Sequence, residues 1–175
     1  MTAAPVSDPR RAALVLVDLM ERVVALPLEP RKGTEVLATA EELATAFRRA
    51  GALVVLVRAE RPAVAEQPPG SGLVPGLLRD GDLEVVKRTV GAFQGTGLDE
   101  RLRERGITTL VFGGIATNLG VESTARAAAD LGYDLVFAED AMAALTGAEH
   151  EASVRLDFPR LGTVTTASRL RAALG

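Results

Sequence analysis

The chain has no cysteine, a single histidine and few aromatic residues, which make up 3% of its 175 positions. Without cysteine it can form no disulfide, no thiolate metal site and no cysteine nucleophile. One histidine cannot make a zinc-binding pair, and no Asp-x-Asp-x-Asp-Gly cluster is present for calcium. We therefore expect neither a metal nor another cofactor, and acid–base chemistry by carboxylates and lysine remains.

Charge and hydropathy exclude two further classes of protein. The net charge is −3, and lysine and arginine are spread along the chain, so no concentrated basic patch for nucleic acid is expected. No apolar run approaches the roughly 20 residues that span a bilayer. The first residues, MTAAPVSDPRRA, lack the basic-then-apolar order of a signal peptide. These features predict a cytoplasmic protein that acts on a small molecule.

Six short, Val-rich apolar runs bounded by Gly, Pro or Asp indicate strands. Their residues do not alternate between apolar and polar, which is typical of a parallel sheet covered by helices on both faces. Segments of helical period lie between most of them. Strand and helix alternate along residues 1–175, which predicts a single α/β, doubly wound domain. The runs are residues 13–18, 52–58, 83–88, 109–114, 134–140 and 162–167.

The clearest helix is TEVLATAEELATAFRRAG, in which one apolar stripe ends at Gly51. The same pattern precedes Gly106 and Gly132, and a final amphipathic segment runs from Ser168 to Leu174. The stripe consists of Val36, Leu37, Ala40, Leu43, Ala44 and Phe47.

One connection interrupts the alternation of strands and helices. The segment from Ala59 to Asp82 is rich in proline and glycine and has no sustained periodicity. Irregular loops of this length are usually functional or mobile, so it is either a lid over a site or a tolerated surface insertion.

Ligands of open α/β sheets collect at the carboxyl ends of the strands, where three candidate features lie. Asp18 ends the first apolar run, Lys87 lies with Arg88 at the end of the third, and the bend from Gly113 to Gly120 lies at the end of the fourth. Burial would raise the pKa of Asp18, and a nearby lysine would lower it. The pair could act as general acid or base, although an Asp after a strand equally suits a structural cap.

The glycine spacing of the bend does not fit known phosphate loops. Gly114 and Gly120 are followed by Val121 and Glu122, which excludes both the dinucleotide fingerprint and the P-loop. The Gly-x-Ser-x-Gly nucleophile pattern is also missing. His150 is expected to be an exposed or capping residue of a helix rather than a ligand or base.

Taken in order, LVLVDLM, VVKRTVGAFQGTGLDERLRERGI, VFGGIATNLGVESTARAAADLGYDLVFAEDA and FPRLGTVTTASRL resemble the isochorismatase-like hydrolase family over almost the whole chain. The resemblance implies a three-layer fold with a six-stranded parallel sheet in the order 3-2-1-4-5-6. It therefore places the ends of the first and fourth strands side by side. It also implies a homodimer or a larger homo-oligomer.

Site residues follow from the resemblance by position. Asp18 matches the family's acid/base carboxylate, and Lys87 matches its lysine partner. The Ile115–Ala116 peptide bond matches one that is usually cis, in a bend that directs backbone N–H groups at a substrate oxygen. Gly120 stands where the family has its nucleophilic cysteine, which excludes the thioester route of nicotinamidase-type and carbamoylsarcosine-type members.

Two further departures from the family's sequence pattern narrow the predicted activity. The metal-binding histidines of nicotinamidase-like members are absent after the second strand, where this chain has Arg58, Ala59, Glu60 and Arg61. Isochorismatases also carry glycine at position 120, and in their reaction an Asp protonates a vinyl ether and water adds to the resulting cation. The bend IATNLG differs from theirs and looks closer to a cysteine-less subgroup of bacterial members, so isochorismate is one option among several.

Other residues near the predicted site each have two roles to consider. Thr117 and Asn118 are expected to bind the backbone of their own bend, with substrate contact as the second reading. We interpret Phe93 as a residue that lines the pocket rather than as part of the hydrophobic core. Arg58 could hold a substrate carboxylate or form a salt bridge at the strand end.

Two functions remain open. The first is a hydrolase of a small anionic or amide-like molecule that uses Asp18, Lys87 and backbone donors of the bend. The alternative is a catalytically silent ligand-binding or scaffold protein on the same fold.

Overall fold

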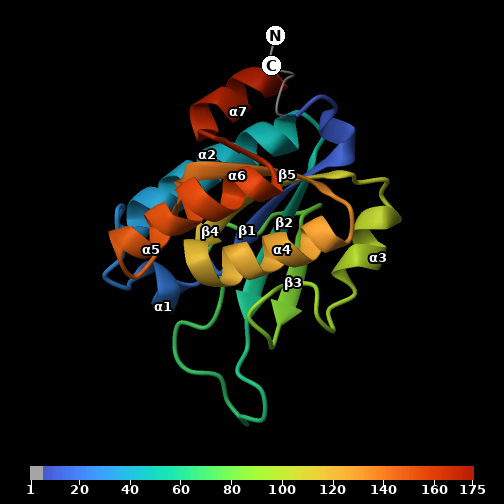
Figure 1. Cartoon of the computed structure of the whole chain (residues 1–175). Helices are drawn as coiled ribbons and strands as arrows, with labels where there is room; N and C mark the ends of the chain where they lie inside the picture. The colour runs from blue at the N-terminus through green and yellow to red at the C-terminus, as the bar shows by residue number, and fades with distance from the viewer. Residues whose placement is uncertain (1–5) are drawn as a thin grey trace.

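The computed structural model describes residues 6–175, and its centre is a six-stranded parallel sheet with helices on both faces (Figure 1). The strand order is β3-β2-β1-β4-β5-β6, which confirms the expected arrangement. Every pair of neighbouring strands is parallel. The strands are β1 (Ala12–Val17), β2 (Leu53–Ala59), β3 (Leu83–Lys87), β4 (Thr109–Ile115), β5 (Asp134–Ala143) and β6 (Thr163–Thr165).

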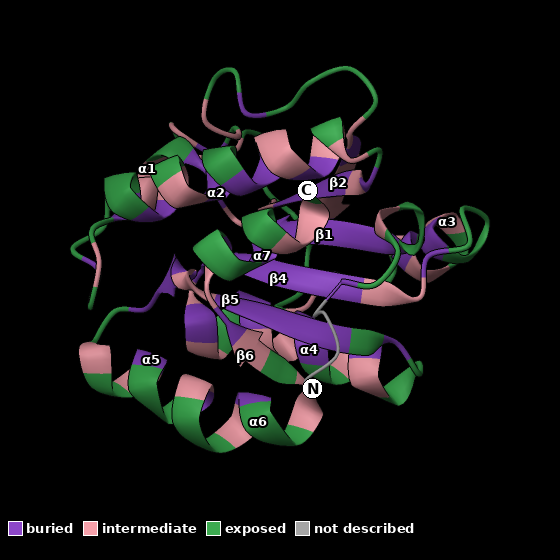
Figure 2. Ribbon diagram, turned by 90° about the horizontal axis from the view of Figure 1, so that it is seen from above, coloured by how far each residue is buried: buried purple, intermediate pink, exposed green. Residues whose placement is uncertain are grey.

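The helices divide between the two faces of the sheet. Helices α2 and α7 pack on one face, and α3, α4 and α6 pack on the other (Figure 2). The helical segments are α1 (Glu21–Val24), α2 (Gly33–Arg49), α3 (Leu98–Arg103), α4 (Glu122–Asp130), α5 (Gly147–Ala152), α6 (Phe158–Leu161), α7 (Ala167–Leu174), the 3-10 turn η1 (Pro9–Arg11) and the π-helical turns η2 (Thr117–Val121) and η3 (Ser153–Asp157).

The central strand shows why the apolar runs do not alternate. All six residues of β1 are buried, because successive side chains enter two different cores. Leu14 and Leu16 pack toward α2, whereas Val15 and Val17 pack toward α3 and α4. A strand between two helical layers has no face that could accept polar residues.

Strands β1 and β4 lie side by side where the strand order reverses, and the chain leaves them toward opposite faces. Gly114 pairs with Val17 at this point and has a φ of 117°. A Cβ atom at Gly114 would collide with the Val17 carbonyl oxygen, so only glycine allows β4 to approach β1 this closely.

The connection between β2 and β3 contains no helix or regular strand, as expected for the irregular segment from Ala59 to Asp82. Its second half is fastened to α1, where the N–H of Arg22 donates to the Gly70 carbonyl at 3.0 Å and Met20 bridges Leu73. Its tip extends away from the body of the molecule (Figure 1), and the side chain of Gln67 closes it by two hydrogen bonds to the Arg61 backbone. No helix within residues 6–175 is long and apolar enough to cross a membrane.

Candidate active site

Asp18 and Lys87 meet at the carboxyl end of the sheet, although they come from different strands. Asp18 directly follows β1 and has a φ of 53°, and Lys87 is the last residue of β3. Asp18 Oδ2 lies 3.0 Å from Lys87 Nζ, and the two side chains are 14% and 4% exposed. The structure therefore brings together the two residues that the sequence singled out.

Burial and charge act on the Asp18 carboxyl in opposite directions. Desolvation raises its pKa, while Lys87 and, more weakly, Arg22 lower it. Desolvation has the larger effect, so the net pKa of Asp18 lies above its usual range despite the ion pair. Asp18 Oδ1 is buried and has no hydrogen-bond partner among the described residues.

Lys87 holds Asp18 in a fixed position. Its ammonium group has three donors, and three oxygen atoms surround it. Besides Asp18 Oδ2, these are the carbonyl oxygens of Val90 at 2.8 Å and Thr89 at 3.4 Å. All three donors are therefore occupied by the protein itself, and Lys87 acts on the site through Asp18.

Gly120 lies directly against this pair. A Cβ atom at position 120 would lie 3.3 Å from Asp18 Oδ2, 3.5 Å from Lys87 Nζ and 2.9 Å from Val17 Cγ1. A side chain at position 120 would therefore point at the carboxylate and the ammonium and would crowd both.

A buried threonine connects the bend to the loop after β3. Thr124 Oγ1 donates to the Gly120 carbonyl at 2.6 Å and accepts from the Ala92 N–H at 3.1 Å. Sequence reasoning missed this residue. Its signal was a threonine one turn after Gly120 on the buried face of α4, beside Ala125 and Ala128.

The bend that ends β4 has the cis peptide bond at Ile115–Ala116 that the resemblance implied. The Ile115 side chain is buried in the core beside α2, and Ala116 packs against the same cluster, so neither residue offers a polar side chain to a ligand. The N–H groups of Leu119 and Val121 both donate to the Ala116 carbonyl. Thr117 and Asn118 begin η2, and the first N–H groups of a helical turn have no partner within it.

The expectations for His150 and Thr117 were wrong. His150 is 5% exposed, and its Nδ1 lies 2.7 Å from Thr117 Oγ1, so Thr117 binds the α5 histidine instead of its own bend. Desolvation and the nearby Arg31 lower the pKa of His150, while Glu139 raises it. The capping box that starts α5 at Thr146 turns the histidine inward, which the sequence around a lone His did not reveal.

Phe93 contacts a second aromatic ring, and its place in a pocket wall stays a prediction. Its ring packs against Tyr133 with 6.1 Å between ring centroids, beside the core that α3 and α4 cover. Tyr133 immediately precedes β5, at the amino end of that strand.

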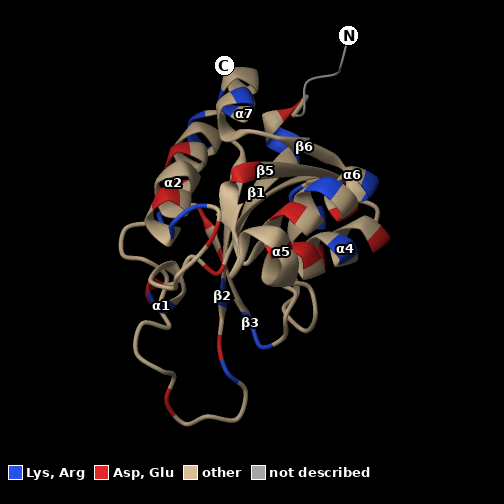
Figure 3. Cartoon of the chain, turned by 60° about the vertical axis from the view of Figure 1, so that its left-hand side comes forward, with Lys and Arg blue, Asp and Glu red and all other residues tan. Residues whose placement is uncertain are grey.

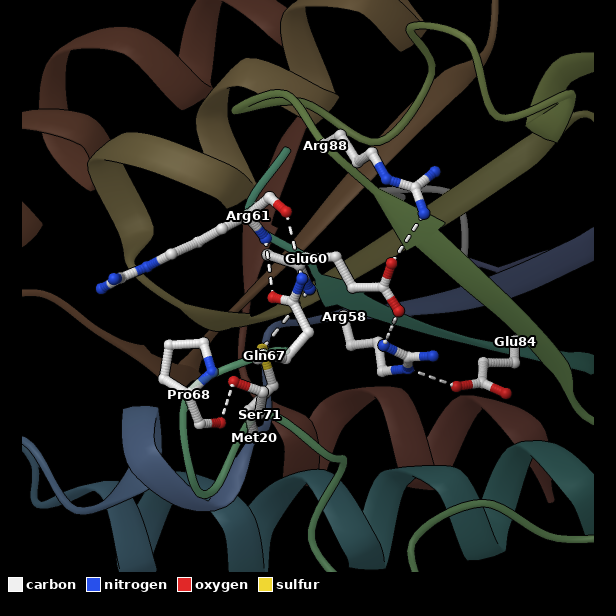
Figure 4. Close-up of polar contacts among 10 residues, drawn as sticks. Met20, Arg58, Glu60, Arg61, Gln67, Pro68, Ser71, Glu84 and Arg88 are labelled. Atoms are coloured by element: carbon white, nitrogen blue, oxygen red, sulfur yellow. Dashed lines mark hydrogen bonds and ion pairs between the residues drawn. The ribbon is translucent and has the colours of Figure 1, made fainter. Parts of the chain in front are cut away.

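Arg58 forms a salt bridge, which was the second of the two roles considered for it. Its Nε lies 2.7 Å from Glu84 Oε1 and its Nη1 lies 2.8 Å from Glu60 Oε1 (Figure 4). Because side chains alternate along a strand, Arg58 and Glu84 lie on the opposite face of the sheet from Val57 and Lys87. The structure therefore does not bring Arg58 to the Asp18 site.

Among residues 6–175, no group of three or more His, Asp or Glu side chains could hold a metal ion. Acidic and basic residues are interspersed along the helices in the view of Figure 3. The arrangement at the carboxyl end of the sheet is thus a buried acid, a fixed ammonium, and a cysteine-free bend.

The sequence model of the isochorismatase domain matches residues 12–169, which include every element from β1 into α7. The chain belongs to the isochorismatase family. It is 40% identical to the isochorismatase family protein YecD of Escherichia coli O157:H7, over 95% of this chain and 98% of that protein.

Solved structures of isochorismatase family members have the same fold. An isochorismatase family protein from Burkholderia thailandensis is 37% identical with a TM-score of 0.85, covering 98% of this chain and 99% of that one. An N-carbamoylsarcosine amidase from Thermoplasma acidophilum is 26% identical with a TM-score of 0.77, covering 90% and 96%. The family is one of hydrolases.

Proposed function

We propose that this isochorismatase-like protein hydrolyses a small metabolite in the cytoplasm by acid–base chemistry at Asp18, without a covalent nucleophile. The observation that carries the proposal is the buried Asp18–Lys87 ion pair beside Gly120, with Asp18 Oδ1 left without a partner. Desolvation raises the pKa of Asp18, which favours the protonated carboxyl group that a general acid requires.

A vinyl ether of the isochorismate type suits this arrangement. Asp18 transfers its proton to the terminal carbon of the double bond, and the ether-bearing carbon becomes an oxocarbenium ion. Water adds to that carbon and returns a proton to Asp18. The resulting hemiketal then breaks into a ketone and an alcohol, so the net reaction consumes one water molecule.

Each residue of the site has a separate part in this scheme. Lys87 fixes the Asp18 carboxyl and compensates its charge when the proton has left. Gly120 adds no side chain against Asp18, on the side where water or the reacting group would approach the carboxyl. The N–H groups at the start of η2, at Thr117 and Asn118, supply donors to a substrate oxygen.

The test is a metabolite screen that includes isochorismate, nicotinamide and simple carboxamides, followed by product analysis. Turnover of a vinyl ether in D₂O should place one solvent-derived deuterium in the new methyl group, because the proton that Asp18 transfers exchanges with solvent. Turnover of nicotinamide would contradict the absence of covalent chemistry. Binding without conversion at high protein concentration would favour the alternative, a catalytically silent binding protein.

A further inference from the structure

Two buried side-chain polar atoms within residues 6–175 lack a hydrogen-bond partner, and both belong to the segment that follows β1. One is the acceptor Asp18 Oδ1, and the other is the donor Arg22 Nε. Buried polar atoms are nearly always paired, so an unpaired acceptor and an unpaired donor in one segment indicate partners that arrive with a ligand.

Arg22 differs from the other half-buried arginines of the chain. Arg31, Arg48 and Arg58 each form an ion pair with a carboxylate, at 3.3 Å, 2.6 Å and 2.7 Å, and Arg101 Nη1 donates to the Glu84 carbonyl at 3.3 Å. In the part of the chain that the structure describes, the Arg22 side chain forms neither an ion pair nor a hydrogen bond, and its Nε is buried. Its planar guanidinium therefore keeps its capacity for an external anion.

The main chain holds Arg22 in place beside the site. Its N–H donates to the Gly70 carbonyl at 3.0 Å, so the loop between β2 and β3 fastens the start of α1. Its positive charge is close enough to Asp18 to lower the pKa of that carboxyl. Gly70 has a φ of 72°, and a Cβ there would lie 3.1 Å from Arg22 Cβ, so the loop passes closely over this residue.

We infer that Arg22 is a substrate-binding residue that receives an anionic group, a carboxylate, of a substrate whose reacting atom lies at Asp18. The inference rests on the proposed function and narrows its substrate class from anionic or amide-like molecules to carboxylates. A carboxylate accepts two N–H groups of one guanidinium, which orients the molecule as well as binding it. A neutral carboxamide offers one acceptor oxygen and no charge, so it should bind less tightly.

The experiment measures binding without requiring turnover. Acetate, acrylate, benzoate and nicotinate are titrated beside acetamide, acrylamide, benzamide and nicotinamide, and ligand-observed NMR gives each dissociation constant. The proteins compared are the wild type, Arg22→Gln, Arg22→Lys and the control Arg49→Gln, which changes an exposed arginine on α2. Thermal unfolding of each variant identifies any loss of fold, and Arg22→Lys keeps the charge if Arg22→Gln does not fold.

At least one carboxylate should bind the wild type more tightly than its amide. Arg22→Gln should weaken that binding on the order of tenfold and remove the preference. Arg22→Lys should keep part of the preference, because the charge remains without the planar fork, and Arg49→Gln should behave as wild type. The inference is overturned if no carboxylate is preferred by the wild type, or if the preference survives in Arg22→Gln.

The two proposals fail in different ways. Turnover of a neutral substrate with kcat/KM unchanged by Arg22→Gln overturns the role of Arg22 and leaves Asp18 chemistry standing. Carboxylate binding that depends on Arg22, in a protein that converts none of the screened compounds, supports Arg22 and counts against the proposed hydrolysis.

Discussion

Asp18 Oδ2 and Lys87 Nζ lie 3.0 Å apart, yet the two residues end strands that are not neighbours in the sheet, because β2 lies between β1 and β3. The contact spans β2 because Asp18 leaves β1 with a positive φ and the Lys87 side chain follows the face that Val57 and Val85 line. The Asp18 carboxyl, the Lys87 ammonium and Gly120 therefore form one compact site, and five predictions follow from its geometry and from the neighbouring contact of His150 with Thr117.

Asp18→Asn should abolish hydrolysis while preserving the fold. The amide keeps the shape of the carboxyl group but cannot transfer the proton, so kcat/KM should fall by about 10²- to 10⁴-fold. Asp80→Asn, on the exposed part of the β2–β3 loop, is the matched control and should leave kcat/KM unchanged. Steady-state kinetics on the substrate from the screen measures both, and undiminished turnover in Asp18→Asn would rule out Asp18 as the acid.

Lys87→Met should shift the pH dependence of activity upward. Lys87 lowers the pKa of Asp18, so its removal raises that pKa further and keeps Asp18 protonated to higher pH. Because activity needs the protonated acid, kcat/KM should decline at higher pH in the variant than in the wild type. A kcat/KM profile that shifts to lower pH, or does not shift, would contradict this role.

The same variant should be less stable at neutral pH. Removing one member of a buried ion pair costs roughly 3 kcal/mol, since the remaining carboxylate stays buried without its partner. The cost should be smaller at acidic pH, where Asp18 is protonated and uncharged. Urea unfolding at two pH values measures the difference.

Gly120→Ala should impair activity much more than stability. Alanine favours a helical conformation over glycine by up to about 1 kcal/mol, and this gain offsets part of the crowding against Val17 Cγ1. The new Cβ, 3.3 Å from Asp18 Oδ2, occupies the space proposed for water or the reacting group. We expect kcat/KM to fall at least about tenfold with a nearly unchanged unfolding midpoint. A folded variant with normal kcat/KM would mean that this space is not used.

His150→Gln should flatten the pH dependence of stability. The pKa of His150 is lowered in the folded state, so its contribution to stability is present above the unfolded pKa, about 6.5, and is lost as pH falls through the folded pKa. Glutamine does not titrate but can still form a hydrogen bond with the Thr117 hydroxyl. Because His150 is the only histidine, the variant should lose that pH-dependent fall in the free energy of unfolding. An equal fall in both proteins would assign it to other groups.

The apolar runs determined much of the fold by themselves. Continuous Val and Leu without alternation is compatible only with strands covered on both faces, and all of β1 is buried accordingly. The positions of Asp18 and Lys87 at strand ends were also sufficient to place both at one edge of the sheet, because parallel strands end together. The resemblance to the family supplied the strand order and the cis peptide bond, which periodicity does not contain.

Side-chain direction was decided only by the tertiary structure. Arg58 lies one residue before the end of β2, the strand beside β1, but the alternation of side chains places it on the other face, where it binds two carboxylates. His150 turns inward because the capped start of α5 orients it toward Thr117. Arg22 belongs to no sequence motif that predicts a function. It is a candidate substrate-binding residue only because its unpaired Nε is buried near Asp18. Whether a polar residue reaches a partner depends on packing between segments distant in the chain, and no local pattern records that.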